Sequence, residues 1–197
     1  MTESPISPFE AFRGRSCGEC SLCCKLLAIE ELNKPRNQWC DRCNAGRGCR
    51  SYDTRPRECR EFSCGFLTLP QLDSAWYPQA AKLIVCPEPG GHAIYVHVDP
   101  SRPDAWRREP FFSRIKQWAC EAASVQGHVI VCVGLKRIVV LPDSEVDLGV
   151  VESDEIVVTA QSRGRSGIEL RPFKMKRDDP RANQLLPPSS RRAIALA

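Results

Sequence analysis

The chain has 197 residues, and its 28 Lys and Arg against 24 Asp and Glu give a formal net charge of +4. This length suits one ordinary domain, or a small cysteine-rich module beside a second small core. No apolar run is long enough to span a bilayer, and the first residues lack the hydrophobic segment of a secretory signal peptide, so we expect a cytoplasmic protein without a membrane partner.

Most of the twelve cysteines lie within residues 17–64. In a reducing cytoplasm, clustered cysteines are more often metal ligands or redox groups than disulfides, and an exported disulfide protein is the alternative. We predict a metal-binding module over residues 17–66, preceded by a loose lead-in over residues 1–16. The candidate ligands are Cys17, Cys20, Cys23, Cys24, Cys40, Cys43, Cys49, Cys59 and Cys64.

The first four cysteines follow the pattern CGECSLCC. Two residues between cysteines allow a tight turn that aims both sulfurs at one metal. Cys23 and Cys24 are adjacent, and adjacent side chains in a helix diverge by about 100°. If both are ligands, the site holds more than one metal. Apolar residues at helical spacing predict a short helix from about Cys23 to Leu32, and Pro35 ends the pattern.

The later cysteines come from further local patterns. Cys40 and Cys43 repeat the spacing of the first pair, and a glycine-rich turn leads to Cys49.

A second short helix is predicted from Pro56 to Gly65, with a preceding Asp or Thr as its cap. Cys59 and Cys64 are five residues apart in this segment, which places them about 140° from each other on a regular helix. Either the helix unwinds before Cys64, or the two cysteines bind different metals.

Thiolates are soft ligands with high affinity for zinc, iron–sulfur clusters and copper(I). Four thiolates satisfy one tetrahedral zinc, so the cysteines can hold two zinc ions, or three if some sulfurs bridge. The spacing CxxCxxC also resembles three corners of a [4Fe–4S] cluster. We favour zinc because all-cysteine zinc sites are common, and we keep an iron–sulfur cluster as the alternative.

Arginines among the later cysteines are expected to offset the charge of the thiolates, which explains them without a nucleic-acid surface. They are Arg42, Arg47, Arg50, Arg55, Arg57 and Arg60.

Residues 67–160 are predicted to form a small α+β region. Pro110 opens an amphipathic helix, and Gly127 follows its end. The strand candidates are residues 82–86, 93–98, 128–133, 137–141, 148–151 and 155–160, with a hairpin between the third and the fourth. The three remaining cysteines are expected to be small buried side chains and not ligands: Cys86, Cys120 and Cys132.

Residues 161–197 carry nine basic and three acidic side chains, a local net charge of +6. We expect a mostly disordered basic tail, with disorder from about residue 174. The predicted fold class is therefore α+β: a small cysteine-rich metal module with short helices, then a small antiparallel β region with one packed helix, then the tail.

The stretches CGECSLCC and GCRSYDTRPRECREFSC resemble the CxxCxxCC proteins, the YkgJ-type cysteine cluster family, described as a zinc- or iron-chelating domain. The resemblance covers about residues 17–66. It implies a cysteine-ligated metal cluster and leaves open the assignment of the middle ligands. The matching positions are Cys17, Cys20, Cys23, Cys24, Cys49, Tyr52, Arg55, Pro56, Cys59 and Phe62.

The leading hypothesis is a metal-binding protein whose zinc or iron–sulfur cluster is structural or redox-related. One alternative is an iron–sulfur-dependent protein-modifying enzyme, because flagellin lysine N-methylases resemble this family. The chain shows no glycine-rich cofactor-binding signature, so that activity is not carried over. Another alternative is a zinc module that binds nucleic acid through the arginines and the tail, which we do not favour. A protein partner is left open.

Overall fold

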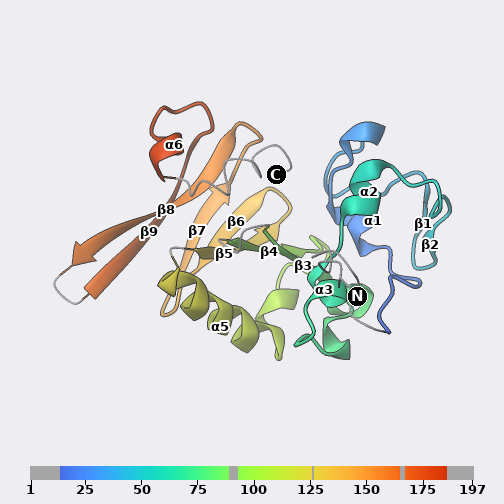
Figure 1. Cartoon of the computed structure of the whole chain (residues 1–197), viewed down its shortest axis with the longest axis horizontal. Coiled ribbons are helices and arrows are strands. Elements are labelled where there is room, and N and C mark those ends of the chain that lie inside the picture. The colour runs from blue at the N-terminus through green and yellow to red at the C-terminus, as the bar shows by residue number, and fades with distance from the viewer. Residues whose placement is uncertain (1–13, 89–92, 126, 165–166, 186–197) are drawn as a thin grey trace, which may run out of the picture. The chain divides into compact units, whose positions relative to one another are not determined.

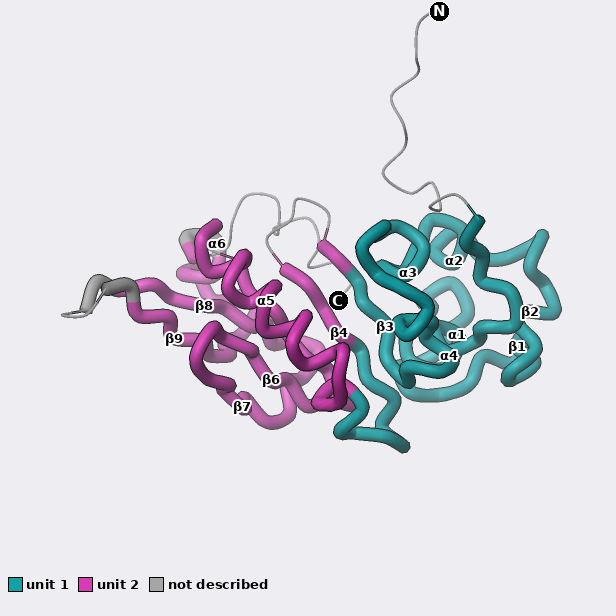
Figure 2. Tube along the Cα trace, turned by 90° about the horizontal axis from the view of Figure 1, so that it is seen from below, with its two compact units in different colours: residues 1–86, 97–105 teal, residues 87–96, 106–197 magenta. Residues whose placement is uncertain are grey.

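The computed structural model describes residues 14–88, 93–125, 127–164 and 167–185 (Figure 1). The chain divides into two compact units (Figure 2). Unit 1 comprises residues 1–86 and 97–105, and unit 2 comprises residues 87–96 and 106–197. The unit that holds the cysteine-rich segment therefore extends past residue 66, the limit set for the module from sequence. The lead-in over residues 1–13 lies outside the described residues.

Unit 1 is built from short elements. They are α1 (Leu22–Leu26), the 3-10 helix η1 (Glu30–Leu32), β1 (Cys43–Asn44), β2 (Gly48–Cys49), α2 (Arg57–Glu61), α3 (Gly65–Thr68), the 3-10 helix η2 (Ser74–Trp76), α4 (Pro78–Ala81) and β3 (Leu83–Pro87). Leu22, Leu26 and Ile84 form a small apolar cluster in this unit. Such short helices are not stable alone in water, so their stability has to come from tertiary contacts.

The predicted helix from Cys23 to Leu32 is too long, because α1 ends at Leu26 and only the 3-10 helix η1 follows within the predicted range. The carbonyl oxygen of Cys24 accepts a hydrogen bond from the backbone N–H of Cys40, and that of Leu26 accepts one from Asn37. Carbonyl oxygens that would accept the next hydrogen bonds of the helix thus accept instead from N–H groups of a later loop. The segment after α1 turns back on itself in an isolated bridge.

The second predicted helix, from Pro56 to Gly65, is also too long. Helix α2 ends at Glu61, and Phe62 is extended, so the helix unwinds before Cys64. Gly65 begins the next helix, α3, instead of ending this one. No side chain caps α2.

Unit 2 contains most of the β structure. Its elements are β4 (Ala93–Val98, whose last two residues belong to unit 1), the 3-10 helix η3 (Ala105–Arg107, from its second residue), α5 (Phe111–Ser124), β5 (His128–Val133), β6 (Lys136–Val140), β7 (Glu145–Val150), β8 (Glu155–Gly164), β9 (Gly167–Lys176) and α6 (Ala182–Leu185). The strand order in the five-stranded sheet is β3-β4-β5-β6-β7. Strands β8 and β9 form a separate antiparallel hairpin.

The core of unit 2 follows the alternation of side chains along a strand. Ile130 and Cys132 of β5 pack with Val157 and Leu170 of the β8–β9 hairpin. Helix α5 packs against β5 (Figure 1) and buries Trp118 among other apolar side chains. The α+β class, the β5–β6 hairpin and the helix after Pro110 are thereby confirmed.

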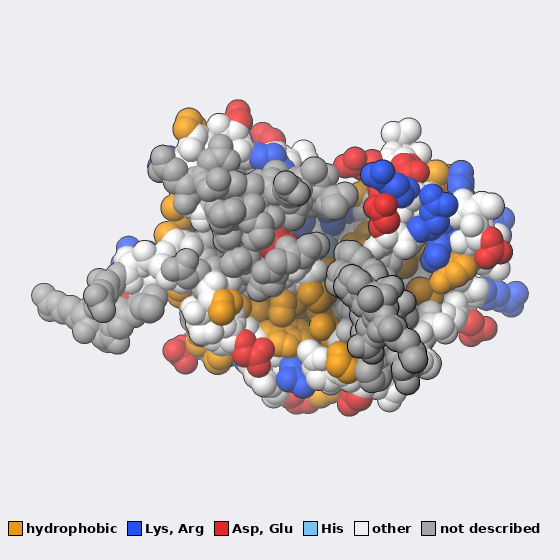
Figure 3. Space-filling view, in the orientation of Figure 1, with side chains coloured by type: hydrophobic (Ala, Val, Ile, Leu, Met, Phe, Trp, Pro, Cys, Tyr) orange, Lys and Arg blue, Asp and Glu red, His pale blue; other side chains and the backbone are white. Residues whose placement is uncertain are grey.

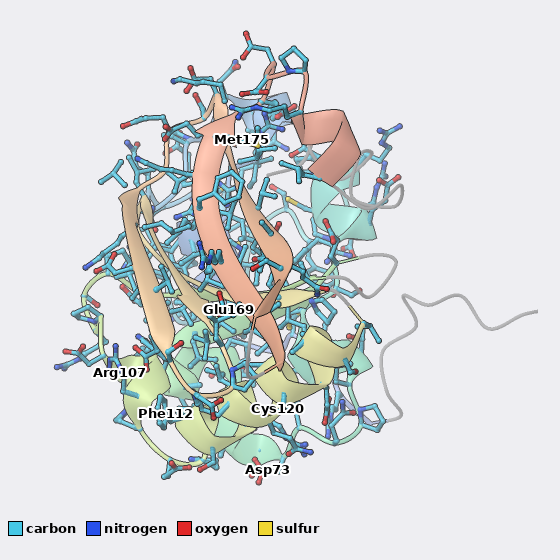
Figure 4. All side chains as sticks on the ribbon, turned by 90° about the vertical axis from the view of Figure 1, so that its left-hand side faces the viewer. Asp73, Arg107, Phe112, Cys120, Glu169 and Met175 are labelled. Atoms are coloured by element: carbon cyan, nitrogen blue, oxygen red, sulfur yellow. The ribbon has the colours of Figure 1, made fainter. Side chains whose placement is uncertain are left out.

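Two expectations for this unit are corrected. The expected start of disorder at about residue 174 is too early, because β9 continues to Lys176 and α6 follows it; residues 161–164 and 167–176 of the basic tail complete β8 and form β9. The pairing of β8 with β9 satisfies the backbone hydrogen-bonding groups of both strands, and the polar composition of the segment does not predict this pairing. Residues 186–197 lie outside the described part. Cys120 of α5 (Figure 4) is exposed and not buried, whereas Cys132 is buried.

Within the described ranges, no helix is both long enough and apolar enough to cross a membrane.

Candidate metal centre

Two tight turns present the first and second cysteine pairs. The backbone N–H of Cys20 donates to the carbonyl of Cys17 at 2.8 Å, and that of Cys43 donates to the carbonyl of Cys40 at 2.9 Å. The pairs Cys17–Cys20 and Cys40–Cys43 therefore form the turns predicted from their spacing. The Tyr77 hydroxyl donates to the Cys17 carbonyl at 3.1 Å, which ties the first turn to a segment 60 residues later.

The β1–β2 hairpin places Cys43 directly opposite Cys49. Gly46 and Gly48 in this hairpin have φ values of +76° and +93°, in the region that favours glycine. A Cβ atom on Gly48 would lie 3.2 Å from the carbonyl oxygen of Gly18. The glycines thus let the hairpin approach the first cysteine turn closely.

Ser21 ties the same two loops together, although no motif in the sequence singled it out. It is fully buried, and its Oγ accepts a hydrogen bond from the N–H of Gly46 at 2.9 Å. The side-chain oxygen of Gln79 accepts from the backbone N–H of Ser21 at 3.4 Å. In the sequence, only the position of this serine between two cysteines of the motif distinguishes it.

Helix α2, which carries Cys59, is held by a reciprocal pair of carboxylates. The Glu58 carboxylate accepts from the N–H groups of Glu30 and Glu31 at 3.0 and 3.2 Å. The Glu31 carboxylate accepts in turn from the N–H of Glu58 at 3.0 Å. These bonds satisfy N–H groups at the starts of η1 and α2, and they fix Cys59 relative to the segment that follows α1.

The nine thiols fall into two groups according to which thiols repel one another strongly enough to raise a pKa. The three-thiol group consists of Cys17, Cys20 and Cys64, and the six-thiol group consists of Cys23, Cys24, Cys40, Cys43, Cys49 and Cys59. Cys20 is also coupled to Cys24, so the two groups adjoin.

In the three-thiol group, burial and repulsion from Cys17 and Cys20 raise the pKa of Cys64 to about 11. Burial and repulsion from Cys17 likewise raise the pKa of Cys20. Repulsion from neighbouring thiols thus adds to burial in favouring the protonated form of Cys20 and Cys64.

In the six-thiol group, burial and repulsion from Cys24, Cys40 and Cys49 raise the pKa of Cys59 to about 11. Burial and repulsion from Cys24 raise the pKa of Cys43 to about 12. Hydrogen bonding to Cys23 and burial raise the pKa of Cys24 as well. Cys59, from α2, thus lies near thiols from α1, from the second cysteine turn and from the hairpin.

Lys34 is a buried cation beside the six-thiol group. Its side chain is 8 % exposed, and its ammonium donates to the carbonyl oxygens of Lys25, at 3.3 Å, and Leu27. Burial lowers the pKa of Lys34, while thiolate charge at Cys40 and Cys24 opposes that shift. A buried lysine therefore faces these thiols, whereas the sequence pattern pointed only to arginines as the compensating cations.

The described contacts of the arginines are with other groups. Arg50 donates to the carbonyl of Asp41, and Arg57 pairs with Glu61 at 3.4 Å on the surface. Arg55 stacks on the Tyr52 ring at 3.7 Å, and its buried Nε has no hydrogen-bond partner among the described residues. Charge compensation of the thiolates by arginines stays a prediction.

None of the twelve cysteines, all of which are described, forms a disulfide. Among the side chains that the structure describes, no three Cys, His, Asp or Glu residues are arranged closely enough to hold a metal ion as they stand. The candidate donors are nevertheless thiols carried by several segments of unit 1, and thiols are the soft ligands typical of zinc and iron–sulfur sites.

No protein-family model, no curated protein and no solved structure matches the chain. The resemblance to the YkgJ-type family has no support from these comparisons and remains a hypothesis that rests on the motif residues.

Proposed function

We propose that the cysteine-rich segment of this protein binds metal ions through the nine cysteines of its two thiol groups. Two or three zinc ions are favoured, and an iron–sulfur cluster is the alternative. The observation that carries the proposal is that backbone contacts bring cysteine-bearing segments together: the N–H of Cys40 donates to the carbonyl of Cys24, and Cys43 lies opposite Cys49 in the hairpin. Crowded, partly buried thiols are neutralised either by protons or by a metal, and a divalent cation neutralises several at once.

A structural role for the metal is supported by the construction of unit 1. Its helices in the cysteine-rich segment have four or five residues, and its hairpin strands have two. Elements this short contribute little stability by themselves. Metal binding would supply free energy of folding to them, because the ligands are brought together only in the folded chain. A redox role for the same cluster is compatible with this arrangement.

The charge distribution favours the metal proposal over a nucleic-acid surface. Over the region of α2, β1 and β2, Lys and Arg side chains are interspersed with Asp and Glu (Figure 3). A surface that binds the phosphate backbone of nucleic acid instead gathers its basic side chains in a patch or stripe. The proposal also places the protein in a reducing compartment such as the cytoplasm, where the thiols stay available as ligands.

The test is anaerobic purification followed by metal analysis and an absorption spectrum. We expect a colourless protein with two or three zinc ions per chain. Broad visible absorbance with acid-labile sulfide would replace zinc by an iron–sulfur cluster. A chain with neither metal and with its thiols paired as disulfides would refute the proposal.

A pair of variants checks which thiols are used. Cys20→Ser is expected to lower the metal content and to destabilise unit 1, since site formation and folding are coupled. Cys132→Ser, at a buried cysteine of unit 2, is the matched control and is expected to leave the metal content unchanged.

A further inference from the structure

Cys43 and Cys49 face each other across the two strands of the β1–β2 hairpin. The backbone N–H of Arg50 donates to the carbonyl of Arg42 at 2.9 Å, so the two cysteines occupy a non-hydrogen-bonded position of the ladder. Opposite residues at such a position point to the same face of the hairpin, with their Cα atoms about 4.5 Å apart. The register of the backbone therefore sets the two thiols side by side.

The spacing of this position falls within the range that a disulfide requires. Bridged cysteines have Cα atoms about 4.4–6.8 Å apart and Cβ atoms about 3.5–4.5 Å apart. The Cys43 thiol already lies against the opposite strand, because its Sγ donates to the carbonyl oxygen of Gly48 at 3.7 Å. Cys43 and Cys49 are both free thiols in this structure. A bond between their sulfurs therefore needs rotation of the side chains but no change in the pairing of the strands.

The hairpin is open to a small oxidant. Cys43 and Cys49 are half-buried, and their chain neighbours Arg42 and Arg50 are exposed. Cys40, the other cysteine close to Cys43 in the chain, is only 7 % exposed. Cys49 is therefore the partner of Cys43 that is both aligned by the strand register and within reach of solvent.

We propose that Cys43 and Cys49 are a site of reversible oxidation: a peroxide converts them to a disulfide, and this modification releases metal from the cysteine-rich segment. The disulfide depends only on the hairpin, whereas the release of metal rests on the proposed function. The thiolate is the form of cysteine that binds a metal, so a disulfide between two of the nine candidate ligands leaves fewer sulfurs to hold the ions.

The reaction balances with one peroxide molecule per disulfide. The thiolate of one cysteine attacks a peroxide oxygen, the O–O bond breaks, and a sulfenic acid and water result after proton transfer. The second thiol attacks the sulfenic sulfur, the S–S bond forms, the S–O bond breaks, and the oxygen leaves as a second water. The two sulfurs thus lose two electrons, which reduce the peroxide. A thiol reductant reverses the step by exchange and is itself oxidised to a disulfide.

The experiment treats the full-length chain, reduced and prepared anaerobically in metal-free and in Zn²⁺-loaded form, with hydrogen peroxide, and then blocks the remaining thiols. Trypsin cleaves after Arg47, which lies between Cys43 and Cys49, so the two cysteines fall in separate peptides that stay joined only through a disulfide. In the metal-free chain we expect mass spectrometry to show peptide 43–47 joined to peptide 48–50 as the main disulfide product. Dithiothreitol is expected to separate the two peptides again.

In the Zn²⁺-loaded chain we expect the same link to form roughly tenfold more slowly, because bound metal shields the sulfurs from peroxide. A chromogenic zinc chelator is expected to detect zinc released in step with the link. Cys49→Ser is expected to abolish the link. Cys132→Ser, at a buried cysteine of unit 2, is the matched control and is expected to leave both the link and the release of zinc unchanged.

The inference is overturned if peroxide leaves Cys43 and Cys49 unlinked in the metal-free chain, or if Cys43 is joined instead to Cys40 in the tryptic peptide 37–42. It is also overturned if the loaded chain keeps its zinc while the link forms. A wild-type chain that binds no metal would refute the proposed function, which is a different result, because the metal-free chain still shows whether the two cysteines form a disulfide.

Discussion

The ion pair between Lys25 and Asp99 is expected to hold α1 in place, and its removal should destabilise unit 1 measurably. Lys25 follows the ligand candidate Cys24 in the chain, and its ammonium lies 2.6 Å from the Asp99 carboxylate. The side chains are 19 % and 7 % exposed, respectively. Asp99 also accepts from the N–H of Ser101 at 2.9 Å.

The exposure of the pair sets the expected magnitude. Exposed ion pairs contribute about 0–1 kcal/mol, and loss of one partner from a fully buried pair costs about 3–5 kcal/mol. Asp99→Asn leaves the Lys25 ammonium mostly buried without its counter-charge, so we expect a loss of about 2–3 kcal/mol. For a chain of this length that corresponds to a fall in Tm of roughly 4–12 °C.

The assay is thermal and urea unfolding of the full-length chain as purified under anaerobic conditions, with Glu61→Gln as the control. Glu61 pairs with Arg57 within the same unit, but the two side chains are 66 % and 74 % exposed, so the expected loss is about 0–0.5 kcal/mol. Equal losses for Asp99→Asn and Glu61→Gln would refute the reasoning from burial.

The pH dependence of this pair gives an independent check. Burial by itself would raise the pKa of Asp99, but the hydrogen bonds from Lys25 and Ser101 outweigh it and leave the pKa below its usual range. A lowered pKa in the folded state means that the stabilisation is present above about pH 4 and is lost as the pH falls further. The difference in stability between wild type and Asp99→Asn should therefore be constant from neutral pH to about pH 5 and shrink below pH 4.

The remaining predictions concern the loops that carry the cysteines. Gly65→Ala places a Cβ against Val85 and is expected to cost about 1–3 kcal/mol, partly offset by about 1 kcal/mol of helix propensity; an unfolding curve that shows a net gain above 1 kcal/mol would contradict the close contact. Ser21→Ala removes the acceptor of the Gly46 N–H and is expected to cost about 1–3 kcal/mol, whereas a loss below 0.3 kcal/mol would mean that this bond does not hold the hairpin. Because the pKa of Cys64 is raised to about 11 in the folded chain, the thiol of the unfolded chain ionises first as the pH rises. The metal-free chain should therefore be most stable below about pH 9 and lose stability from pH 9 to 11. Denaturation midpoints across that range test this, and a flat profile would contradict it.

Local patterns in the sequence were sufficient where local physics decides the structure. The turns at the two CxxC pairs depend on four residues each and formed as predicted. The helix after Pro110 has a regular apolar stripe over four turns, and it was predicted to within a residue or two. The β5–β6 hairpin likewise follows from two β-branched runs around a short turn that contains Gly134.

Long-range contacts decided the rest, and a single sequence does not display them. The apolar spacing after Cys23 is helical, yet the helix stops at Leu26, because its carbonyl binds Asn37. Cys86 fits an apolar strand, and nothing local in the sequence shows that it borders the same apolar cluster as Cys64, 22 residues earlier. The polar composition of β9 indicated disorder, although its partner strand β8 satisfies its backbone.

The six-thiol group has the number of sulfurs that a pair of zinc ions needs. Each tetrahedral zinc takes four ligands, so two ions need eight ligand positions. Six thiolates fill these positions if two of the sulfurs bridge the two ions. The adjacent cysteines Cys23 and Cys24 suit such a pair, since neighbours in a helix point in different directions. Six thiolates with two divalent ions leave a charge of −2, and the buried ammonium of Lys34 reduces it to −1.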